Sequence, residues 1–463
     1  MITNLEQNIH YLQNPLMSKK QLNLFDLVMI VVSLVIGMGI FRTPVVAASR
    51  AGTPFIFFLA WLTGGVIALF GALTYAEIGS RYPVTGGYYK VFSYGYHPSL
   101  GFAVNCIILV SNAGSTAVVA LIGAEYIGHF FYAGPAPEIF RQGVAIGGIA
   151  FFYVINLLGL RMSSRVQNIL TIIKLLMVLL LLASIFGTHP ITTSAIVGKV
   201  GQGGSGLGFF KSLGFALIAV SFSYGGYQQT INFGGEVGNP RRVIPRGIAF
   251  GIIIIITVYL SLNFVYTQVI GFEQLKTADS IAAILMNHLF GPTGDTLLRV
   301  LMFLSVMAYV NVSLMSNPRV MYAMSGEGIL PAVFQKKTGR RDVILWSLTA
   351  FSAAMIVTLL FSSAVDRIIN YTIFLDSIGF ATSAATIFIL RRRKTGEDKG
   401  EIYRMRFFPL VPVVFILAYL CVATSIILAD PSSAMYGALI FIGFLILYFI
   451  VKGRRKPIAR PEL

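Results

Sequence analysis

The sequence predicts an all-α polytopic membrane protein with twelve transmembrane helices, and three observations support this fold class. Hydrophobic residues make up 56% of the 463 residues and charged residues only 11%, and the mean hydropathy is +0.78. These values lie far outside the range of a soluble domain. Apolar runs long enough to cross a bilayer recur along the whole chain. The alternation typical of membrane β-strands is absent, so we expect the spans to be helices.

The expected spans follow one another with short connections. This predicts one membrane domain over 24–452, between an N-terminal tail (1–23) and a basic C-terminal tail (453–463). Two sets of five spans cover about 24–187 and 208–391, and two further spans cover about 408–452. In chain order the twelve spans are 24–49, 54–79, 101–131, 141–160, 167–187, 208–235, 246–270, 294–324, 343–363, 366–391, 408–429 and 433–452.

The positive charge is distributed unevenly between the two sides of the predicted membrane domain. The net charge is +17, and with a cytoplasmic N-terminus the inner segments carry 25 of the 35 Lys and Arg residues, against 8 in the outer loops. This asymmetry sets orientation in a membrane and does not indicate a nucleic-acid partner. We therefore expect a multi-pass protein of the cell membrane with both termini cytoplasmic. The basic cluster 391–394 is expected to anchor the chain beside acidic lipid headgroups.

Targeting signals and metal-binding motifs are absent from the sequence. The tail 1–23 is polar and lacks the apolar core of a cleavable signal peptide. Cys106 and Cys421 both fall within predicted spans, which leaves no disulfide framework and no CxxC site. The five histidines are scattered over tails, loops and span ends. We expect neither a metal nor any other cofactor.

Two predicted spans contain glycines at their centres. The first span has Gly37-Met38-Gly39 in the middle of "VSLVIGMGIFRTPVVAAS", although each glycine costs about 1 kcal/mol relative to alanine in a helix. Glycines also permit close helix packing, so this pair alone leaves two interpretations open. The sixth span has Gly225 and Gly226 at its centre, followed by the polar stretch 228–232. Irregular backbone in a membrane survives only inside protein or beside a watery cavity.

Spans one and six are the first members of the two five-span sets. Interrupted helices at corresponding positions of two halves point to a transporter binding site at the membrane midplane. We therefore predict a five-plus-five inverted repeat with discontinuous helices 1 and 6. The repeat is inferred from this layout, because no residue-by-residue repetition joins the halves. Such breaks expose N–H groups at a positive dipole end and C=O groups at a negative end, a combination that suits a zwitterion.

Several motifs resemble the amino acid–polyamine–organocation superfamily, especially its L-type amino acid transporter branch. "VIGMGIFRTP" is similar to the first-helix signature, and "FSYGGYQQTINFGGEVGNPRRVIPRGI" to helix 6 and its exit. "ALTYAEIGSRYPVTGGYYKVF", "SSRVQNILTIIKLL", "NPRVMYAMSGEGILP" and "YRMRFFPLVPVVFILAYLCVATSIILADP" resemble segments around helices 2, 5, 8 and 11. The matches are collinear from about residue 24 to 452. The resemblance implies the twelve-helix inverted-repeat fold and secondary transport of amino acids or their relatives by alternating access, either as exchange or coupled to protons.

The resemblance also implies roles for particular residues. The backbone amides of 37–40 would bind the substrate carboxylate, and carbonyls near Ile36 and at the helix 6 break would receive its ammonium group. Phe222 would close over the substrate, and Gln228 would line the pocket. Relatives usually carry a small residue, often serine, where this chain has Met38, so the size of the preferred substrate side chain stays open. The implied substrate-binding residues are Ile36, Gly37, Met38, Gly39, Ile40, Phe222, Gly225, Gly226 and Gln228.

Lys174 lies about seven residues into the predicted fifth span, roughly 10 Å from its inner end. Taken alone, it fits a lysine whose ammonium group reaches the cytoplasmic interface. Relatives carry a lysine at this place that faces helices 1 and 8, where sodium-coupled members of the fold hold a cation. The resemblance therefore implies that Lys174 replaces sodium, and we predict sodium-independent transport.

Asp376, in the middle of the predicted tenth span, has three open interpretations. A carboxylate at this depth is costly and usually functional. It would carry a proton, bind a polar or cationic substrate end, or serve helix packing through hydroxyls such as those of Thr372 or Ser377. Asn112, Asn311 and Ser313 either line the cavity or join helices.

Other functions and partners are less well supported. The sequence has no HExxH motif for a membrane enzyme and no TVGYG-like filter for a channel. A cationic amino acid or polyamine transporter of the same fold stays open as an alternative. Some relatives pair with a glycoprotein through a cysteine between helices 3 and 4, but 131–143 contains none. We expect an amino acid substrate and the lipid bilayer as partners, with neither nucleic acid nor a disulfide-linked accessory subunit.

Overall fold

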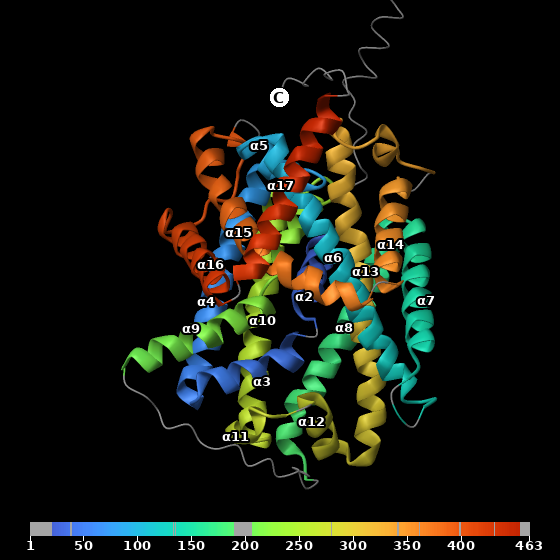
Figure 1. Cartoon of the computed structure of the whole chain (residues 1–463), viewed down its shortest axis with the longest axis vertical. Coiled ribbons are helices and arrows are strands. Elements are labelled where there is room, and N and C mark those ends of the chain that lie inside the picture. The colour runs from blue at the N-terminus through green and yellow to red at the C-terminus, as the bar shows by residue number, and fades with distance from the viewer. Residues whose placement is uncertain are drawn as a thin grey trace, which may run out of the picture.

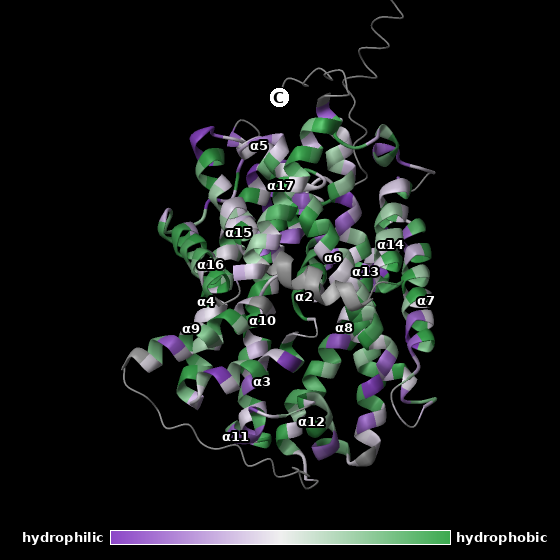
Figure 2. Cartoon of the chain, in the orientation of Figure 1, coloured by the Kyte–Doolittle hydropathy of each residue, from purple (hydrophilic) through white to green (hydrophobic). Residues whose placement is uncertain are grey.

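The computed structural model describes residues 21–37, 39–132, 134, 136–188, 206–278, 280–339, 342–360, 362–397, 400–429 and 431–453. It describes only the backbone of residues 206–207, Phe222, Pro292, residues 362–373, Ala429, Ser433 and Gly453, and Met38 lies outside the described residues. Most of the longer helices run along the vertical axis of Figure 1, whereas α3 and α9 cross it at a steep angle. Figure 2 shows that apolar residues dominate the peripheral helices, as expected for a surface that faces lipid.

The helices are connected in the order of the predicted spans, with additional short helices between them. The α-helices are α2 (Leu24–Val35), α3 (Gly39–Ala51), α4 (Pro54–Arg81), α5 (Gly87–Gly95), α6 (Pro98–Gly128), α7 (Glu138–Leu157), α8 (Leu160–Ala183), α9 (Gly206–Ser223), α10 (Pro240–Val269), α11 (Phe272–Leu275), α12 (Ile281–Phe290), α13 (Pro292–Gly326), α14 (Leu345–Leu360), α15 (Ser362–Arg392), α16 (Leu410–Ala429) and α17 (Pro431–Gly453). Three short 3-10 helices are η1 (Ser184–Phe186), η2 (Tyr227–Asn232) and η3 (Ala332–Gln335).

Within the described ranges, nine single helices are long and apolar enough to cross a membrane. The pair α2 and α3 qualifies as a tenth span that is bent by 45°. The predicted polytopic all-α membrane fold is therefore confirmed. The predicted sixth and ninth spans correspond to α9 and α14, whose apolar parts are shorter. The count of twelve spans consequently stays a prediction.

The structure differs from the sequence prediction at the start of the fifth span. The prediction begins this span at 167, whereas α8 begins at Leu160, directly after Gly159 with its φ of 96°. Arg161 and Arg165 lie in the first turns of the helix, where long basic side chains reach water without ending the helix. Lys174 therefore lies fourteen residues from the helix start, about 21 Å along the axis. The predicted distance of roughly 10 Å was wrong.

The interrupted helix formed by α2 and α3 packs against different neighbours on the two sides of its break. α2 packs against α10 and α8, whereas α3 packs against α9. α4 in turn packs against both α10 and α9. The two interrupted helices are thus held side by side, and Figure 1 shows α3 and α9 next to each other at the lower left of the molecule.

A buried ion-pair cluster joins α4, α15 and the segment before α16 at the upper end of the molecule, where α17 ends in Figure 1. Glu77, near the end of α4, has no exposed surface. Its carboxylate accepts hydrogen bonds from Arg81 Nε at 2.7 Å and from Arg391 of α15 at 2.8 and 2.6 Å. It also accepts the Met405 N–H at 2.8 Å, just before α16. The Arg391 guanidinium lies 3.8 Å from the centre of the Phe408 ring. We call this group the Glu77 cluster.

A second carboxylate, Glu327, joins α5 to the end of α13 at the same end of the molecule. It accepts hydrogen bonds from Tyr89 Oη and Ser93 Oγ at 2.6 Å each and from Lys90 Nζ at 2.8 Å. Burial raises the pKa of the Tyr89 phenol above its ordinary value, and the nearby Glu327 carboxylate raises it further. The phenol therefore stays protonated and serves as a hydrogen-bond donor.

Candidate functional site

The break in the first span extends from Ile36 to the start of α3. Ile36 N–H donates to Val32 O and Gly37 N–H to Val35 O, both at 2.8 Å. The Gly37 amide was predicted to bind the substrate carboxylate. Its N–H already donates to Val35 O, so the substrate carboxylate would compete with that carbonyl. α3 begins at Gly39, and the first N–H groups of a helix have no partner within that helix. A Cβ atom added to Gly37 would meet no described heavy atom within 4 Å, so open space adjoins this residue.

The break in the sixth span lies against the break in the first. α9 ends at Ser223, and η2 begins at Tyr227. Between them Gly226 has a φ of +116°, and a Cβ atom added to it would lie 2.5 Å from Leu34 O. A Cβ atom on Gly39 would lie 3.1 Å from Ser223 Oγ. The two breaks, which include Gly225, therefore form one site built mainly from backbone.

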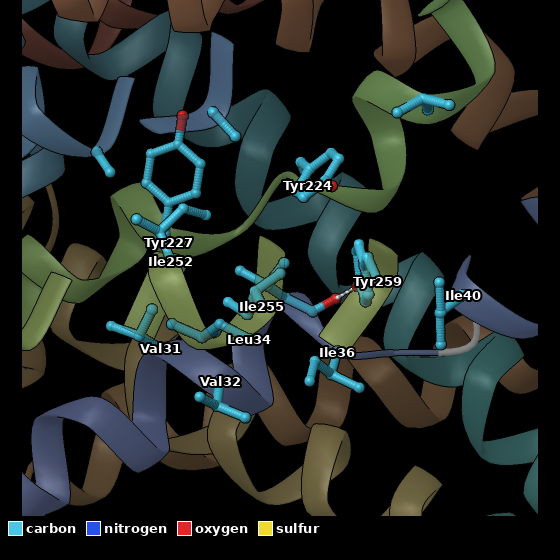
Figure 3. Close-up of a cluster of buried hydrophobic side chains, with 14 of the residues drawn as sticks. Val31, Val32, Leu34, Ile36, Ile40, Tyr224, Tyr227, Ile252, Ile255 and Tyr259 are labelled. Carbon is cyan, nitrogen blue, oxygen red and sulfur yellow. Dashed lines mark hydrogen bonds between the residues drawn. The ribbon is translucent and has the colours of Figure 1, made fainter. Parts of the chain in front are cut away.

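Tyr259 of α10 reaches both breaks with one hydroxyl. Its Oη lies 3.1 Å from Val35 O and 3.0 Å from Ser223 O, and the side chain is fully buried. One phenol proton is donated to one carbonyl at a time, so the hydroxyl can bridge either side. Figure 3 shows Tyr259 between Tyr224 and Ile36, where the interrupted helices meet. The sequence does not single out this residue, because a tyrosine in an apolar helix resembles any packing aromatic.

Ser223 leaves a polar atom at the junction of the two breaks. Its Oγ is buried and has no hydrogen-bond partner among the described residues. A buried hydroxyl without a partner costs free energy, so such a group is usually satisfied by water or a ligand. Ser223 Oγ lies beside Gly39, so this hydroxyl without a described partner is next to the start of α3.

Lys174 joins α8 to the break in the first span. Its Nζ donates to Ile36 O at 2.6 Å and to Ser33 Oγ at 3.5 Å, and the side chain has no exposed surface. In the described part of the chain, no ion pair joins Lys174 to a carboxylate. The ammonium group therefore does not reach the interface, and it occupies the Ile36 carbonyl that was predicted to receive the substrate ammonium.

A chain of buried amides continues from this lysine through three helices. Gln167 Nε2 donates to Ser33 Oγ at 2.6 Å, and Asn311 Nδ2 donates to Gln167 Oε1 at 2.8 Å. Asn156 Nδ2 then donates to Asn311 Oδ1 at 3.0 Å. Asn311 is fully buried and joins helices here; it does not face open space.

The other predicted site residues have varied positions. Gln228 Oε1 accepts the Gly226 N–H at 2.9 Å, so this side chain turns back onto its own break. Asn112 of α6 donates to Asn317 of α13 at 2.6 Å and thus joins two helices. Ile40 lies in the first turn of α3 and is buried. Phe222 lies in α9, one residue before Ser223.

Asp376 lies in the middle of α15 and is half-buried. Its carboxylate is hydrogen-bonded to Ser111 of α6. No group of three or more potential metal ligands from His, Cys, Asp and Glu occurs among the described residues.

An interrupted span, α2 and α3, whose break lies against the break after α9, is typical of the secondary-transporter class. The chain belongs to the amino acid permease family, whose profile matches residues 22–451. It is 28% identical to the serine/threonine exchanger SteT of Bacillus subtilis over 442 residues, which cover 94% of this chain and 98% of SteT. It is 25% identical to the human cystine/glutamate transporter over 453 residues, with 96% and 88% coverage. It is 26% identical to human large neutral amino acids transporter small subunit 2 over 447 residues, with 95% and 82% coverage.

Family membership confirms the resemblance predicted from the motifs. The chain is a multi-pass amino acid transporter of the cell membrane and not an enzyme. The family match covers both breaks and Lys174, which all lie between residues 22 and 451.

Proposed function

We propose that the protein is a sodium-independent secondary transporter that exchanges amino acids by alternating access, with the substrate held between the two breaks. The observation that carries this proposal is the contact of Lys174 Nζ with Ile36 O at 2.6 Å in a fully buried position. A fixed ammonium group at the break supplies the positive charge that a bound sodium ion would otherwise provide. Both cations would not share one small site, because their repulsion in a medium of low dielectric constant is strong.

We assign the carboxylate and ammonium groups of the substrate to backbone atoms that do not already take part in the hydrogen bonds described above. The carboxylate binds at the start of α3, at the amides of Gly39 and Ile40, where the helix dipole favours an anion. The Ile36 carbonyl already accepts a hydrogen bond from Lys174, and the Val35 and Ser223 carbonyls share the single phenol proton of Tyr259. The ammonium group therefore binds other carbonyls at the end of α9, together with Ser223 Oγ.

The proposed architecture is the five-plus-five inverted repeat over 24–187 and 208–391, with twelve spans. α16 and α17 follow the second repeat. Both termini are cytoplasmic, so the upper end of Figure 1 faces the cytoplasm. Phe222 closes over the substrate from α9, next to Ser223.

The carrier is proposed to work without a disulfide-linked subunit. One relative is named as a small subunit, but segment 131–143 of this chain contains no cysteine that would join it to a second chain. Exchange is favoured over proton symport because SteT is named an exchanger.

The test is counterflow in proteoliposomes that contain the purified protein. Vesicles loaded with an unlabelled amino acid should accumulate the labelled one equally well in sodium and in choline buffers. Esters and N-acylated amino acids should compete poorly, because each lacks one of the two charges. Uptake that collapses without sodium would contradict the proposal. Uptake driven by a proton gradient would favour symport, and strong competition by a diamine would favour the polyamine alternative.

A further inference from the structure

The side chain of Tyr227, the residue after Gly226, points away from the proposed substrate site. In Figure 3 its hydroxyl is directed away from Ile36 and Ile40, which lie on either side of the break in the first span. The side chain is buried, and its hydroxyl has no hydrogen-bond partner among the described residues. Tyr227 therefore lies behind the break in the sixth span, where it contacts other helices.

Gly71 of α4 lets two aromatic side chains approach the helix backbone. A Cβ atom added to Gly71 would overlap the Tyr227 hydroxyl and the Phe415 ring of α16, and the closest atoms are Tyr227 Oη and Phe415 Cε2. Any other residue carries a Cβ atom, so this approach requires glycine. Phe415 is fully buried, and α16 packs against both α4 and α15. The same point of α4 thus receives Tyr227 from the sixth span and Phe415 from α16.

Ring contacts extend this packing to α15. Between ring centres, Tyr75 of α4 lies 6.1 Å from Tyr227 and 6.2 Å from Phe415, both times edge to face. The Tyr419 ring of α16 lies 4.8 Å from the Phe415 ring and 4.8 Å from the Phe380 ring of α15. Tyr75 Oη donates to Phe380 O at 3.3 Å. We call these five aromatic residues the Tyr227 cluster, which joins the break in the sixth span to α4, α15 and α16.

The other side of this break is held against the first span. A Cβ atom on Gly226 would lie 2.5 Å from Leu34 O, so the two backbones touch there. Tyr227 is bonded directly to Gly226, and a displacement of its ring therefore moves the backbone that faces α2. A site built from backbone groups tolerates little such movement, because a misplacement of about 1 Å can cost about 100-fold in activity.

We propose that the Tyr227 cluster positions the break in the sixth span for substrate binding, with Gly71 and Phe415 as its supports on α4 and α16. These are positioning residues, since they act through Tyr227 and do not touch the substrate. The inference rests on the proposed function, because it assumes that the substrate is bound at the two breaks. It gives α16, which follows the second repeat, a direct part in substrate affinity.

The test compares two glycine variants in proteoliposomes that contain the purified protein. Gly71→Ala inserts a methyl group against Tyr227 and Phe415. The matched control is Gly123→Ala of α6, where a Cβ atom would lie 2.7 Å from Val306 of α13, five residues from the end of α6. The probe is the labelled common amino acid that the wild type exchanges fastest in a counterflow screen. Its half-maximal concentration, the maximal rate and the thermal midpoint are measured for each variant.

We expect Gly71→Ala to raise the half-maximal concentration at least about tenfold, because an overpacked interior displaces side chains and backbone. Gly123→Ala is overpacked as well, but its clash lies between α6 and α13. It should therefore lower the thermal midpoint while it changes the half-maximal concentration by less than about threefold, since distant sites act independently. The difference between the two variants separates a positioning role from a loss of stability.

A rescue experiment identifies the atoms through which Gly71 acts. Tyr227→Phe combined with Phe415→Leu removes the hydroxyl and the Cε2 atom that the new methyl group would meet. In this background Gly71→Ala should raise the half-maximal concentration by less than about threefold, because the effects of contacting residues are not additive. If Gly71→Ala alone does not fold, Phe415→Leu is the second variant. It removes ring contacts without a clash and should raise the half-maximal concentration about threefold or more.

Three results would overturn the inference while leaving the proposed function intact. The first is an unchanged half-maximal concentration in folded Gly71→Ala or, where that variant does not fold, in Phe415→Leu. The second is an equal loss of affinity in Gly123→Ala, which would tie affinity to overall stability. The third is a full loss in the background of Tyr227→Phe and Phe415→Leu, which would show that Gly71 acts through other atoms. Wild-type protein that exchanges no amino acid would instead contradict the proposed function itself.

Discussion

Two glycines at the breaks meet different structural requirements. Gly226 has a φ of +116°, and a Cβ atom on it would approach Leu34 O to 2.5 Å. Gly37 has open space around its Cα, where a Cβ atom would meet no described atom within 4 Å. Gly226 therefore allows the two interrupted helices to touch, whereas Gly37 leaves room beside them.

Gly226→Ala and Gly37→Ala should consequently fail in different ways. Gly226→Ala combines an unfavourable φ with a clash against backbone, so we expect a lower thermal midpoint and loss of transport. Gly37→Ala should keep its thermal midpoint but bind substrate about tenfold more weakly, because the methyl group occupies the space beside the site. Thermal size-exclusion chromatography and counterflow measure the two effects. Unchanged affinity in Gly37→Ala would place the substrate elsewhere.

Lys174 should be essential for transport and not replaceable by arginine. Lys174→Ala leaves the Ile36 carbonyl without its 2.6 Å donor, at about 1–3 kcal/mol for a buried group. It also separates α8 from the break. We expect Lys174→Ala and Lys174→Arg to insert normally and to lose nearly all counterflow, because the planar guanidinium does not match the compact ammonium. Full activity of Lys174→Ala would show that the lysine serves packing alone.

The sequence predicted the breaks and Lys174, but it did not predict Tyr259 or the amide chain. Paired glycines and a lysine are conspicuous in apolar spans, since both are unfavourable there without a special reason. Tyr259, Gln167 and Asn311 have ordinary side chains whose importance depends on which atoms lie opposite them. A single sequence does not show which side chains lie opposite one another. For the same reason it left the roles of Asn112 and Asn311 open.

At the scale of helices, the Glu77 cluster holds the ends of α4 and α15 and the segment before α16 together. Glu77 accepts hydrogen bonds from two guanidinium groups and one backbone N–H. A buried carboxylate that is fully paired costs little, but removing its charge leaves Arg391 without a described carboxylate partner and Arg81 with Glu397 alone. The start of α8 was predicted less well from the sequence than the order of the helices, because the basic residues in the first turns of α8 resembled a loop.

Glu77→Gln should therefore destabilise the protein by about 3–5 kcal/mol, the usual cost of breaking a buried ion pair from one side. The matched control is Glu401→Gln, since Glu401 pairs with Arg242 at 2.9 Å but its side chain is 84% exposed. That control should change stability by less than about 1 kcal/mol. Thermal midpoints in detergent compare the two variants. Equal midpoints would show that the Glu77 cluster contributes no net stability.

At the scale of the whole molecule, orientation in the membrane is the property that the charge distribution predicts most directly. In a variant with Cys106 and Cys421 replaced by alanine, single cysteines are introduced at Glu462 in the C-terminal tail and at Gly134 in the loop before α7. A membrane-impermeant maleimide should label Gly134→Cys in intact cells and Glu462→Cys only after permeabilisation, as the positive-inside asymmetry requires. The reverse labelling pattern would show the opposite orientation in the membrane and would contradict the prediction that the termini are cytoplasmic.

The position of Arg391 in the Glu77 cluster has a consequence for biogenesis. With the proposed orientation, its charge helps to retain the loop after α15 in the cytoplasm while the translocon inserts that helix. After assembly the same guanidinium is bound to Glu77 and covered by the Phe408 ring. The charge that orients the nascent chain is thus partly withdrawn from the lipid headgroups in the mature protein. Arg391 acts first in insertion and later in folding.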